Sequence, residues 1–238
     1  MRIQLFVPCF VDQLFPQTAF NMVKVLERAG CDVTYNPAQT CCGQPAFNAG
    51  YWEEAGTVAR KFCTDFADAA PIVAPSGSCT GFVRNYFSKI LPEELTTGPE
   101  AVPQRAFEFT EFLTGTLGIR KIEGFFEGRA VYHDACGALR ECGIKQGPRE
   151  LLSGIRGLEL VEMKEAETCC GFGGTFAVKY ESISVGMAQT KVQSAIEAGA
   201  DYIISTDLSC LMHIQGYIEK QGLPLQTLHI ADVLAAGL

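Results

Sequence analysis

The sequence predicts an α/β protein made of two pseudo-symmetric, Rossmann-like halves, each a small parallel sheet flanked by helices. Short apolar runs alternate with amphipathic stretches of helical period, and this order occurs twice in the 238 residues. Each half also contains a Cys-Cys-Gly motif, at Cys41-Cys42-Gly43 and at Cys169-Cys170-Gly171. We therefore expect two modules, residues 1–118 and 119–238, joined by a linker near Gly118–Gly128.

In the first half, strands are expected where short apolar or β-branched runs end at turn residues. They are Ile3–Val7, Asp32–Tyr35, Ile72–Ala74 and Phe107–Thr110. The helices expected between them carry apolar residues on one face. They are Pro16–Ala29, Trp52–Ala69, Gly81–Leu91 and Glu111–Leu117. Residues 92–104, rich in Pro, Thr and Glu, are expected to form a surface connection.

The second half repeats this order of elements. Its expected strands are Ala130–His133, Leu158–Met163, Tyr202–Ser205 and Leu225–His229. Its expected helices are Gly147–Ser153, Ser184–Ala198, Cys210–Gln221 and Ile230–Ala236. Equivalent cysteines of the two halves lie 127 to 131 residues apart, and this steady spacing indicates an internal duplication.

Eight of the eleven cysteines form two matching sets of four, each with a lone cysteine before and after the Cys-Cys pair. The first set is Cys9, Cys41, Cys42 and Cys79, and the second is Cys136, Cys169, Cys170 and Cys210. Every member follows the C-terminal end of an expected strand, which is where ligands gather in parallel sheets. We therefore expect the four thiols of each set to converge at one sheet edge.

Soft thiolates gathered in this way suit an iron–sulfur cluster or zinc, with one centre at most in each half. Four converging thiolates repel one another, and bound metal ions remove that cost. A polynuclear cluster meets two adjacent thiolates more easily than one tetrahedral zinc ion does, so we favour the cluster and keep zinc as the alternative. Glycines beside the pairs are expected to supply conformational freedom and, in the second half, amides that donate to cluster sulfur. They are Gly43, Gly171, Gly173 and Gly174.

Other roles for residues near the cysteines stay open. His133 lies close to Cys136, and such a pair can form a thiolate nucleophile, but a nucleophile leaves the other cysteines unexplained. We expect His133 to pack against the site instead. His213 is a candidate extra ligand or a partly buried neighbour, and Cys142 is a candidate neighbour of the second site. The remaining cysteines, expected to be small buried apolar residues, are Cys31 and Cys63.

The composition narrows the classes of partner and compartment. A formal net charge of -8 and a pI near 5.0 disfavour nucleic acid and a polybasic membrane anchor. No apolar run has the length of a transmembrane helix, and the N-terminus lacks the pattern of a signal peptide. We therefore expect a cytoplasmic protein, where reduced cysteines serve as ligands or catalysts before they form disulfides.

Three motifs resemble the cysteine-rich CCG-domain family, which includes the cysteine-rich component of heterodisulfide reductase and the iron–sulfur subunit of glycolate oxidase. They are Cys-Cys-Gly-Gln-Pro-Ala at 41–46, Gly-Ser-Cys-Thr at 77–80 and Cys-Cys-Gly-Phe-Gly-Gly-Thr-Phe at 169–176. The resemblance covers essentially the whole chain. It implies an oxidoreductase subunit without an NAD motif, which carries electrons on a 4Fe-4S type of cluster while L-lactate is oxidised to pyruvate. Its implied partners are two other subunits, including a ferredoxin-type iron–sulfur protein, and any membrane contact would be made through them.

The sequence departs from the fuller family motif at one position in each half. That motif ends in Cys-x-x-Cys and holds a non-cubane four-iron cluster, whereas here Phe82 and His213 replace its last cysteine. A four-thiolate cubane, a more open cluster with an iron free for substrate, and metal in only one half all stay open. Two other functions also stay open: a zinc-stabilised or metal-free scaffold without catalytic role, and a thiol–disulfide redox subunit like that of heterodisulfide reductase.

Overall fold

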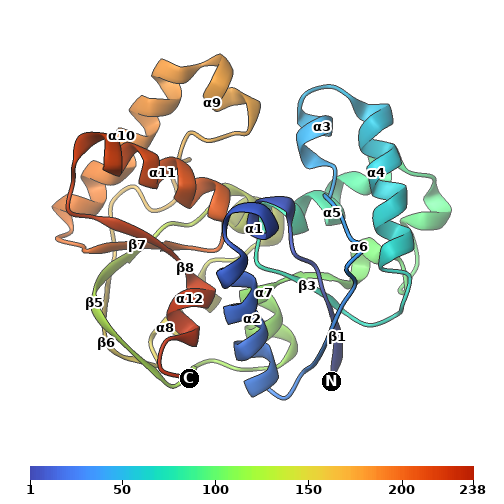
Figure 1. Ribbon diagram of the computed structural model, residues 1–238, viewed down its shortest axis with the longest axis horizontal. Coiled ribbons are helices and arrows are strands. Elements are labelled where there is room, and N and C mark those ends of the chain that lie inside the picture. The colour runs from blue at the N-terminus through green and yellow to red at the C-terminus, as the bar shows by residue number, and fades with distance from the viewer.

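The computed structural model describes residues 1–238 as two α/β halves that lie side by side (Figure 1). Each half contains one four-stranded parallel sheet with helices packed against it, so the expected fold class is confirmed. The N- and C-termini lie at the same end of the molecule in Figure 1, and helices α3 (Gln44–Asn48) and α9 (Thr175–Lys179) lie at the other. No helix is both long enough and apolar enough to cross a membrane.

The first half contributes strands and helices in alternating order. The strands are β1 (Arg2–Leu5), β2 (Asp32–Tyr35), β3 (Ile72–Ala74) and β4 (Ala106–Glu108). The helices are α1 (Cys9–Leu14), α2 (Pro16–Arg28), α3, α4 (Trp52–Asp65), α5 (Gly77–Ile90), the 3-10 turn η1 (Glu93–Leu95), α6 (Val102–Arg105), α7 (Phe109–Glu111) and the π-helical η2 (Phe112–Thr116).

The second half follows the same plan. The strands are β5 (Gly124–Tyr132), β6 (Ile155–Val161), β7 (Tyr202–Ser205) and β8 (Gln226–His229). The helices are the π-helical η3 (Gly137–Glu141), α8 (Gln146–Leu152), α9, α10 (Glu181–Glu197), α11 (Leu208–Gln221) and α12 (Ile230–Ala235).

The two sheets have the same strand order. The first is β2-β1-β3-β4 and the second is β6-β5-β7-β8, and every neighbouring pair is parallel. In both sheets the first strand of the half lies inside the sheet, next to the third. The duplication seen in the cysteine spacing is therefore also present in the topology.

The expected strands Asp32–Tyr35, Ile72–Ala74 and Tyr202–Ser205 have the bounds that the sequence predicted. The expected linker Gly118–Gly128 is wrong in its second part, because β5 begins at Gly124 and pairs there with β6. An irregularity in the register of this pair hides the strand from a search for simple alternation. The division into modules 1–118 and 119–238 stays a prediction. Short helices at α1, α3 and α9 were not expected, since so few residues show no helical period.

The halves pack reciprocally, and one hydrophobic core runs through both. Helix α12 of the second half packs on α2 of the first, while α7 of the first half packs on α8 of the second. Asp232 on α12 accepts hydrogen bonds from Thr18 at 3.0 Å and from Asn21 at 2.9 Å. A second core, rich in phenylalanine, belongs to the first half alone and lies under α4 and α5.

Two glycines let the halves approach at the helix starts that carry cysteines. A Cβ on Gly77 would lie 2.5 Å from Cβ of Ala138, and one on Gly137 would lie 2.6 Å from Cα of Ser78. No side chain fits at such distances, so only glycine allows α5 and η3 to meet this closely. Because Cys79 lies on α5 and Cys136 immediately precedes η3, this contact brings the two cysteine sets near each other.

Candidate metal centres

The cysteines of both sets lie in loops and helix starts that follow strands. Cys9 is the first residue of α1, and Cys79 lies in the first turn of α5. In the second half, Cys136 is the N-cap of η3 and Cys210 lies in the first turn of α11. The positive end of a helix dipole favours a thiolate over a thiol, so these positions suit anionic sulfur.

Within each set the four sulfurs are neighbours. The Sγ atoms of Cys9 and Cys41 are 3.8 Å apart. The thiol of Cys42 contacts those of Cys41 and Cys79, which completes the first set. The second set repeats the chain of contacts from Cys136 through Cys169 and Cys170 to Cys210. Thiols that are far apart in sequence are thus brought together in both halves.

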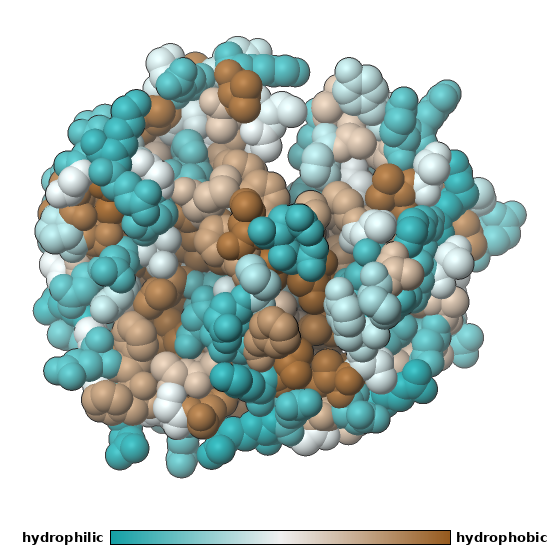
Figure 2. Space-filling model, viewed as in Figure 1, coloured by the Kyte–Doolittle hydropathy of each residue, from teal (hydrophilic) through white to brown (hydrophobic).

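Both sets line a single cavity of about 480 Å³ between the halves. Residues of α3 and of α9 also line it, and Figure 2 shows the molecule notched between these two helices. The cysteines on its wall are Cys9, Cys41, Cys42, Cys79, Cys136, Cys169, Cys170 and Cys210. All eight predicted ligand residues therefore line one cavity.

Contacts within each set move the cysteine pKa values in opposite directions. Hydrogen bonds from Cys42 and Cys9 lower the pKa of Cys41 to about 3. Those from Cys136 and Cys170 lower the pKa of Cys169 to about 2. The same contacts raise the pKa of each neighbouring thiol, so one thiolate per set is stable without metal. Four thiolates per set would need the positive charge of metal ions, and this donor set fits an iron–sulfur cluster or zinc.

Gly43 and Gly171 allow each cysteine loop to lie against a helix. Both have a φ of +95°, which is in the left-handed region that favours glycine. A Cβ on Gly43 would lie 3.2 Å from the carbonyl oxygen of Ala55, and one on Gly171 would lie 2.6 Å from that of Ser184. In each loop the glycine amide donates to the first sulfur of the pair, at 3.3 Å and 3.4 Å.

The second loop contains further glycines and a further amide contact. The Phe172 amide donates to Sγ of Cys170 at 3.5 Å. Gly173 and Gly174 also have positive φ values, of 52° and 61°, and both line the cavity. Amides that point at thiolate sulfur stabilise its negative charge.

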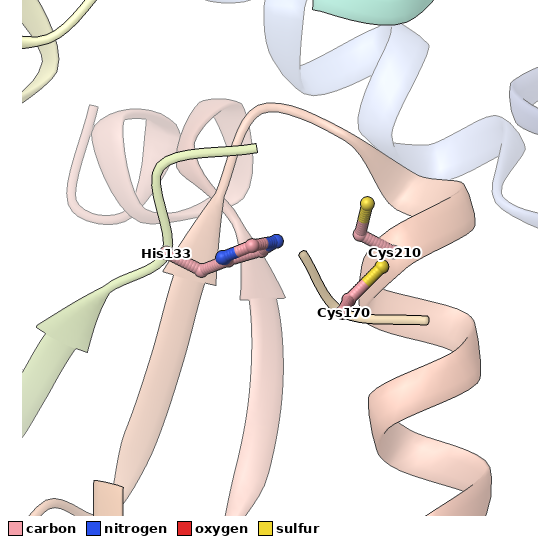
Figure 3. A group of neighbouring side chains, drawn as sticks. All are labelled: His133, Cys170 and Cys210. Atoms are coloured by element: carbon pink, nitrogen blue, oxygen red, sulfur yellow. The ribbon is translucent and has the colours of Figure 1, made fainter. Parts of the chain in front are cut away.

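His133 follows β5 and is fully buried. Its Nδ1 lies 3.3 Å from the carbonyl oxygen of Ala166, while its Nε2 has no hydrogen-bond partner. The ring points toward Cys170 and Cys210 (Figure 3), and the three candidate donor atoms lie within 4.8 Å of one another. Burial and nearby Lys191 lower the pKa of His133 to about 3, so the imidazole is neutral.

Lys191 is a buried cation beside the same set. Its ammonium donates to the carbonyl oxygens of Glu165 and Ala166, the latter at 3.2 Å. Burial lowers the pKa of Lys191 to about 8. The nearby thiols Cys170 and Cys210 favour its charged form, so this side chain is close enough to offset negative charge on the second set.

The structure places the remaining candidates outside this cluster. His213 directs Nε2 at Ser184, 3.1 Å from the hydroxyl and 3.3 Å from the carbonyl oxygen. Cys142 lies 3.5 Å from the carbonyl oxygen of Gly77, and it is absent from the cavity wall. Cys31 is buried in the shared core, as expected, whereas Cys63 is only half-buried.

His133 packs against the second set, as expected, whereas Lys191 was not singled out from the sequence. A residue-by-residue comparison of the halves would have found both. His133 precedes Cys136 by the same interval at which Phe6 precedes Cys9. Lys191 follows Ser184 as Phe62 follows Ala55, and these serine and alanine residues face equivalent glycines. The signal is a polar residue in the second half at a position where the first half has a buried phenylalanine.

Asp207 connects the two halves at the wall of the cavity. Its buried carboxylate accepts hydrogen bonds from the Ser78 amide at 3.0 Å, the Ser78 hydroxyl at 2.7 Å and the Ser76 hydroxyl at 3.1 Å. Burial raises the pKa of Asp207. The N-cap residue of α11 therefore accepts a hydrogen bond from a backbone amide in the first turn of α5, in the other half.

The duplicated cysteine sets correspond to a known domain. The CCG cysteine-rich domain matches residues 3–84 and 130–215, so each match contains one complete set of four cysteines. The chain belongs to the CCG cysteine-rich domain family. Both matched segments also contain the third strand of their half, β3 or β7, and the C-terminal part of the first, β1 or β5.

Relatives in this family match the whole chain. Lactate utilization protein A of an Exiguobacterium species is 42% identical over 241 residues, covering 100% of this chain and 98% of that protein. The Geobacillus kaustophilus protein of the same name is 40% identical over 242 residues, covering 99% of both chains. A crystal structure of a hypothetical protein from Helicobacter pylori is similar in fold, with a TM-score of 0.57 at 13% identity. That alignment covers 98% of this chain and 48% of the other.

Proposed function

We propose that this CCG protein is an iron–sulfur electron-transfer subunit of a multi-protein system that oxidises L-lactate to pyruvate. The observation that carries the proposal is the convergence of eight thiols, in two matched sets, on one cavity. Full-length similarity to proteins named lactate utilization protein A supports the substrate class. The reduced cysteines of such a centre suit the cytoplasm.

The residues that would hold a cluster are the four thiols of each set. Bound there, an iron–sulfur cluster supplies reversible one-electron transfer, at a potential set by burial and by hydrogen bonds to sulfur. The chain itself supplies those hydrogen bonds from the amides of Gly43, Gly171 and Phe172. Gly173 and Gly174, on the cavity wall, would bring further backbone close to the second centre.

We place the binding of lactate on a partner subunit. The residues that line the cavity include neither lysine nor arginine, the usual partners of a substrate carboxylate. The one carboxylate on the wall, Asp207, is buried and would repel a second anion. This composition supports passage of electrons through the cavity more than binding of the acid in it.

The outer surface beside the cavity suits contact with partner proteins. Large apolar side chains are exposed near α3 and near α9, two helices that contribute residues to the cavity wall. They are Tyr51, Trp52, Val178, Tyr180 and Ile183. Exposed apolar groups of this kind are typical of protein interfaces. A ferredoxin-type iron–sulfur subunit docked here would continue the path of the electrons.

Anaerobic iron and sulfide quantitation, combined with visible absorption, tests the proposal. We expect a brown protein that binds iron and sulfide and is bleached by a reductant. A colourless protein with roughly two zinc ions per chain would contradict it and favour the scaffold. Addition of lactate alone should leave the spectrum unchanged, because the acid binds elsewhere. A spectral change on lactate addition would refute the assignment of lactate binding to a partner.

A further inference from the structure

The two halves differ in the residue that follows their first strand. In the first half this residue is Phe6, and in the second it is His133. Both are buried, and both precede the first cysteine of their set by the same interval. Phe6 packs edge-to-face on Phe62, with ring centroids 4.8 Å apart. His133 has no such aromatic partner and neighbours Lys191 instead.

The hydrogen bonding of His133 leaves one nitrogen free to act as a ligand. Nδ1 lies 3.3 Å from the Ala166 carbonyl oxygen, which can only accept, so this nitrogen carries the proton. The lone pair is then on Nε2, which is buried without any partner. A buried acceptor without a partner is costly unless it binds something. Metal-bound histidines commonly have this arrangement, with the second ring N–H donated to a backbone carbonyl.

The free nitrogen lies next to two thiols of the second set. The ring of His133 points toward Cys170 and Cys210, which come from a different loop and a different helix (Figure 3). One donor atom from each of the three residues lies within 4.8 Å of the other two, and all three residues are buried. No hydrogen bond to either sulfur explains this orientation. A metal ion between the three groups would.

We propose that His133 is a nitrogen ligand, through Nε2, of the metal centre held by the second cysteine set. The proposal rests on the proposed function, since it assumes that this set binds an iron–sulfur cluster. It makes the two centres chemically different: sulfur alone in the first half, and sulfur with imidazole nitrogen in the second. A neutral imidazole adds no negative charge, and Lys191 stands beside the same thiols. Both features favour a higher reduction potential at the second centre.

Pulsed electron paramagnetic resonance of the cluster-loaded full chain tests this ligand directly. The protein is prepared anaerobically with unlabelled and with ¹⁵N-labelled histidine and is measured in its paramagnetic state. We expect a nitrogen coupling that changes with the label in the wild type. His133→Phe, which reproduces the first half, should abolish the coupling and lower the potential of the second centre.

Two matched variants serve as controls, and a third covers failure to fold. Phe6→Leu changes the equivalent residue of the first half and should keep the coupling. His213→Gln removes the other nearby histidine, whose Nε2 is directed at Ser184, and should also keep it. If His133→Phe does not fold, His133→Cys retains a metal ligand and should bind iron without the coupling.

The outcomes separate this inference from the proposed function. Iron and sulfide bound to both halves with no label-sensitive coupling would overturn the ligand while leaving the electron carrier intact. A coupling that persists in His133→Phe would overturn it as well. A wild-type chain that binds no iron and sulfide would overturn the proposed function, and the ligand with it.

Discussion

The two halves of this protein hold the same arrangement of four cysteines in opposite surroundings. At three positions near the sets the first half has a phenylalanine where the second half has a polar side chain. The matched pairs are Phe6 with His133, Phe62 with Lys191, and Phe82 with His213. The strand order and the left-handed glycine after each cysteine pair are the same in both halves. The scaffold therefore needs the strands and the glycines, while the residues under each set were free to differ.

The difference teaches where each half gains its stability. In the first half the rings of Phe6, Phe62 and Phe66 lie within 5.8 Å of one another in a core of its own. In the second half, His133 and Lys191 occupy the equivalent space and contribute hydrogen bonds to Ala166 instead of ring packing. Buried polar groups stabilise a fold little but place charge and ligands accurately. We expect the first half to depend on packing and the second on its bound centre.

The largest effect is expected from the thiols themselves. Cys41→Ser and Cys169→Ser change the equivalent sulfur in each half, and each should remove the centre of its own half, or about half of the bound iron. Iron and sulfide analysis of the anaerobic protein measures this. Cys63→Ser, outside both sets, should keep the full content. If either single variant abolishes both centres, the halves do not bind metal independently.

The aromatic and polar surroundings can be compared by their contribution to folding. In the metal-free, reduced chain, Phe62→Ala should cost about 3–5 kcal/mol, because it removes a large ring from a close-packed core. Lys191→Met keeps the length of the side chain and removes a buried charge, so its cost should be under about 1.5 kcal/mol. Urea denaturation gives both values. A larger loss from Lys191→Met than from Phe62→Ala would reverse our account of the two halves.

Much of this fold could be predicted from the sequence. Strand bounds such as Ile72–Ala74 follow from proline on both sides of an apolar run, and the matched spacing of the cysteines fixes the duplication. The convergence of each set follows from the rule that parallel strands end at one edge. The start of β5 could not be predicted, since its first part lies across an irregular register that shows no alternation.

The packing between the halves and the orientation of His133 could not be predicted from the sequence, for a different reason. Reciprocal packing of α12 on α2 depends on how two modules meet, and no local period records it. The close approach of the two halves depends on Gly77 and Gly137. A glycine at the start of a helix can have several causes, so the sequence alone does not reveal this contact. A buried histidine that follows a strand usually has hydrogen-bond partners for both ring nitrogens. Only the folded structure shows that one nitrogen of His133 has no partner.

The residues that cap α7 and α12, Glu108 and His229, ionise to opposite charges and should respond to opposite extremes of pH. Glu108 accepts hydrogen bonds from the Thr110 and Glu111 amides, and burial raises its pKa to about 8. Its favourable neutral form is present at acid pH and is lost as the pH rises through about 8. His229 accepts a hydrogen bond from the Ala231 amide, and burial lowers its pKa. Its contribution is present above its unfolded pKa and is lost as the pH falls.

Stability measured against pH tests this pair of caps. Between about pH 5 and pH 9 the wild type should lose on the order of 2–4 kcal/mol through Glu108. Glu108→Gln is neutral at every pH and keeps an oxygen acceptor, so it should flatten the alkaline side of the profile. His229→Asn should flatten only the acid side. If the stability of Glu108→Gln still falls at alkaline pH, the loss belongs to another group, such as Tyr132, whose pKa is raised by burial.

The smallest effect concerns the caps of α5 and α11, the helices that carry the last cysteine of each set. Ser76 caps its own helix by accepting the Cys79 amide at 3.3 Å. Asp207, at the equivalent place in the second half, instead accepts a hydrogen bond from the Ser78 amide of the first half. Asp207→Ala should cost about 1–3 kcal/mol and speed hydrogen exchange at Ser78, because a buried donor loses its partner. Ser209→Ala, the counterpart of Ser78 on α11, should change stability by less than about 0.5 kcal/mol. Unchanged exchange at Ser78 in Asp207→Ala would show that the halves are held together by their packed helices alone.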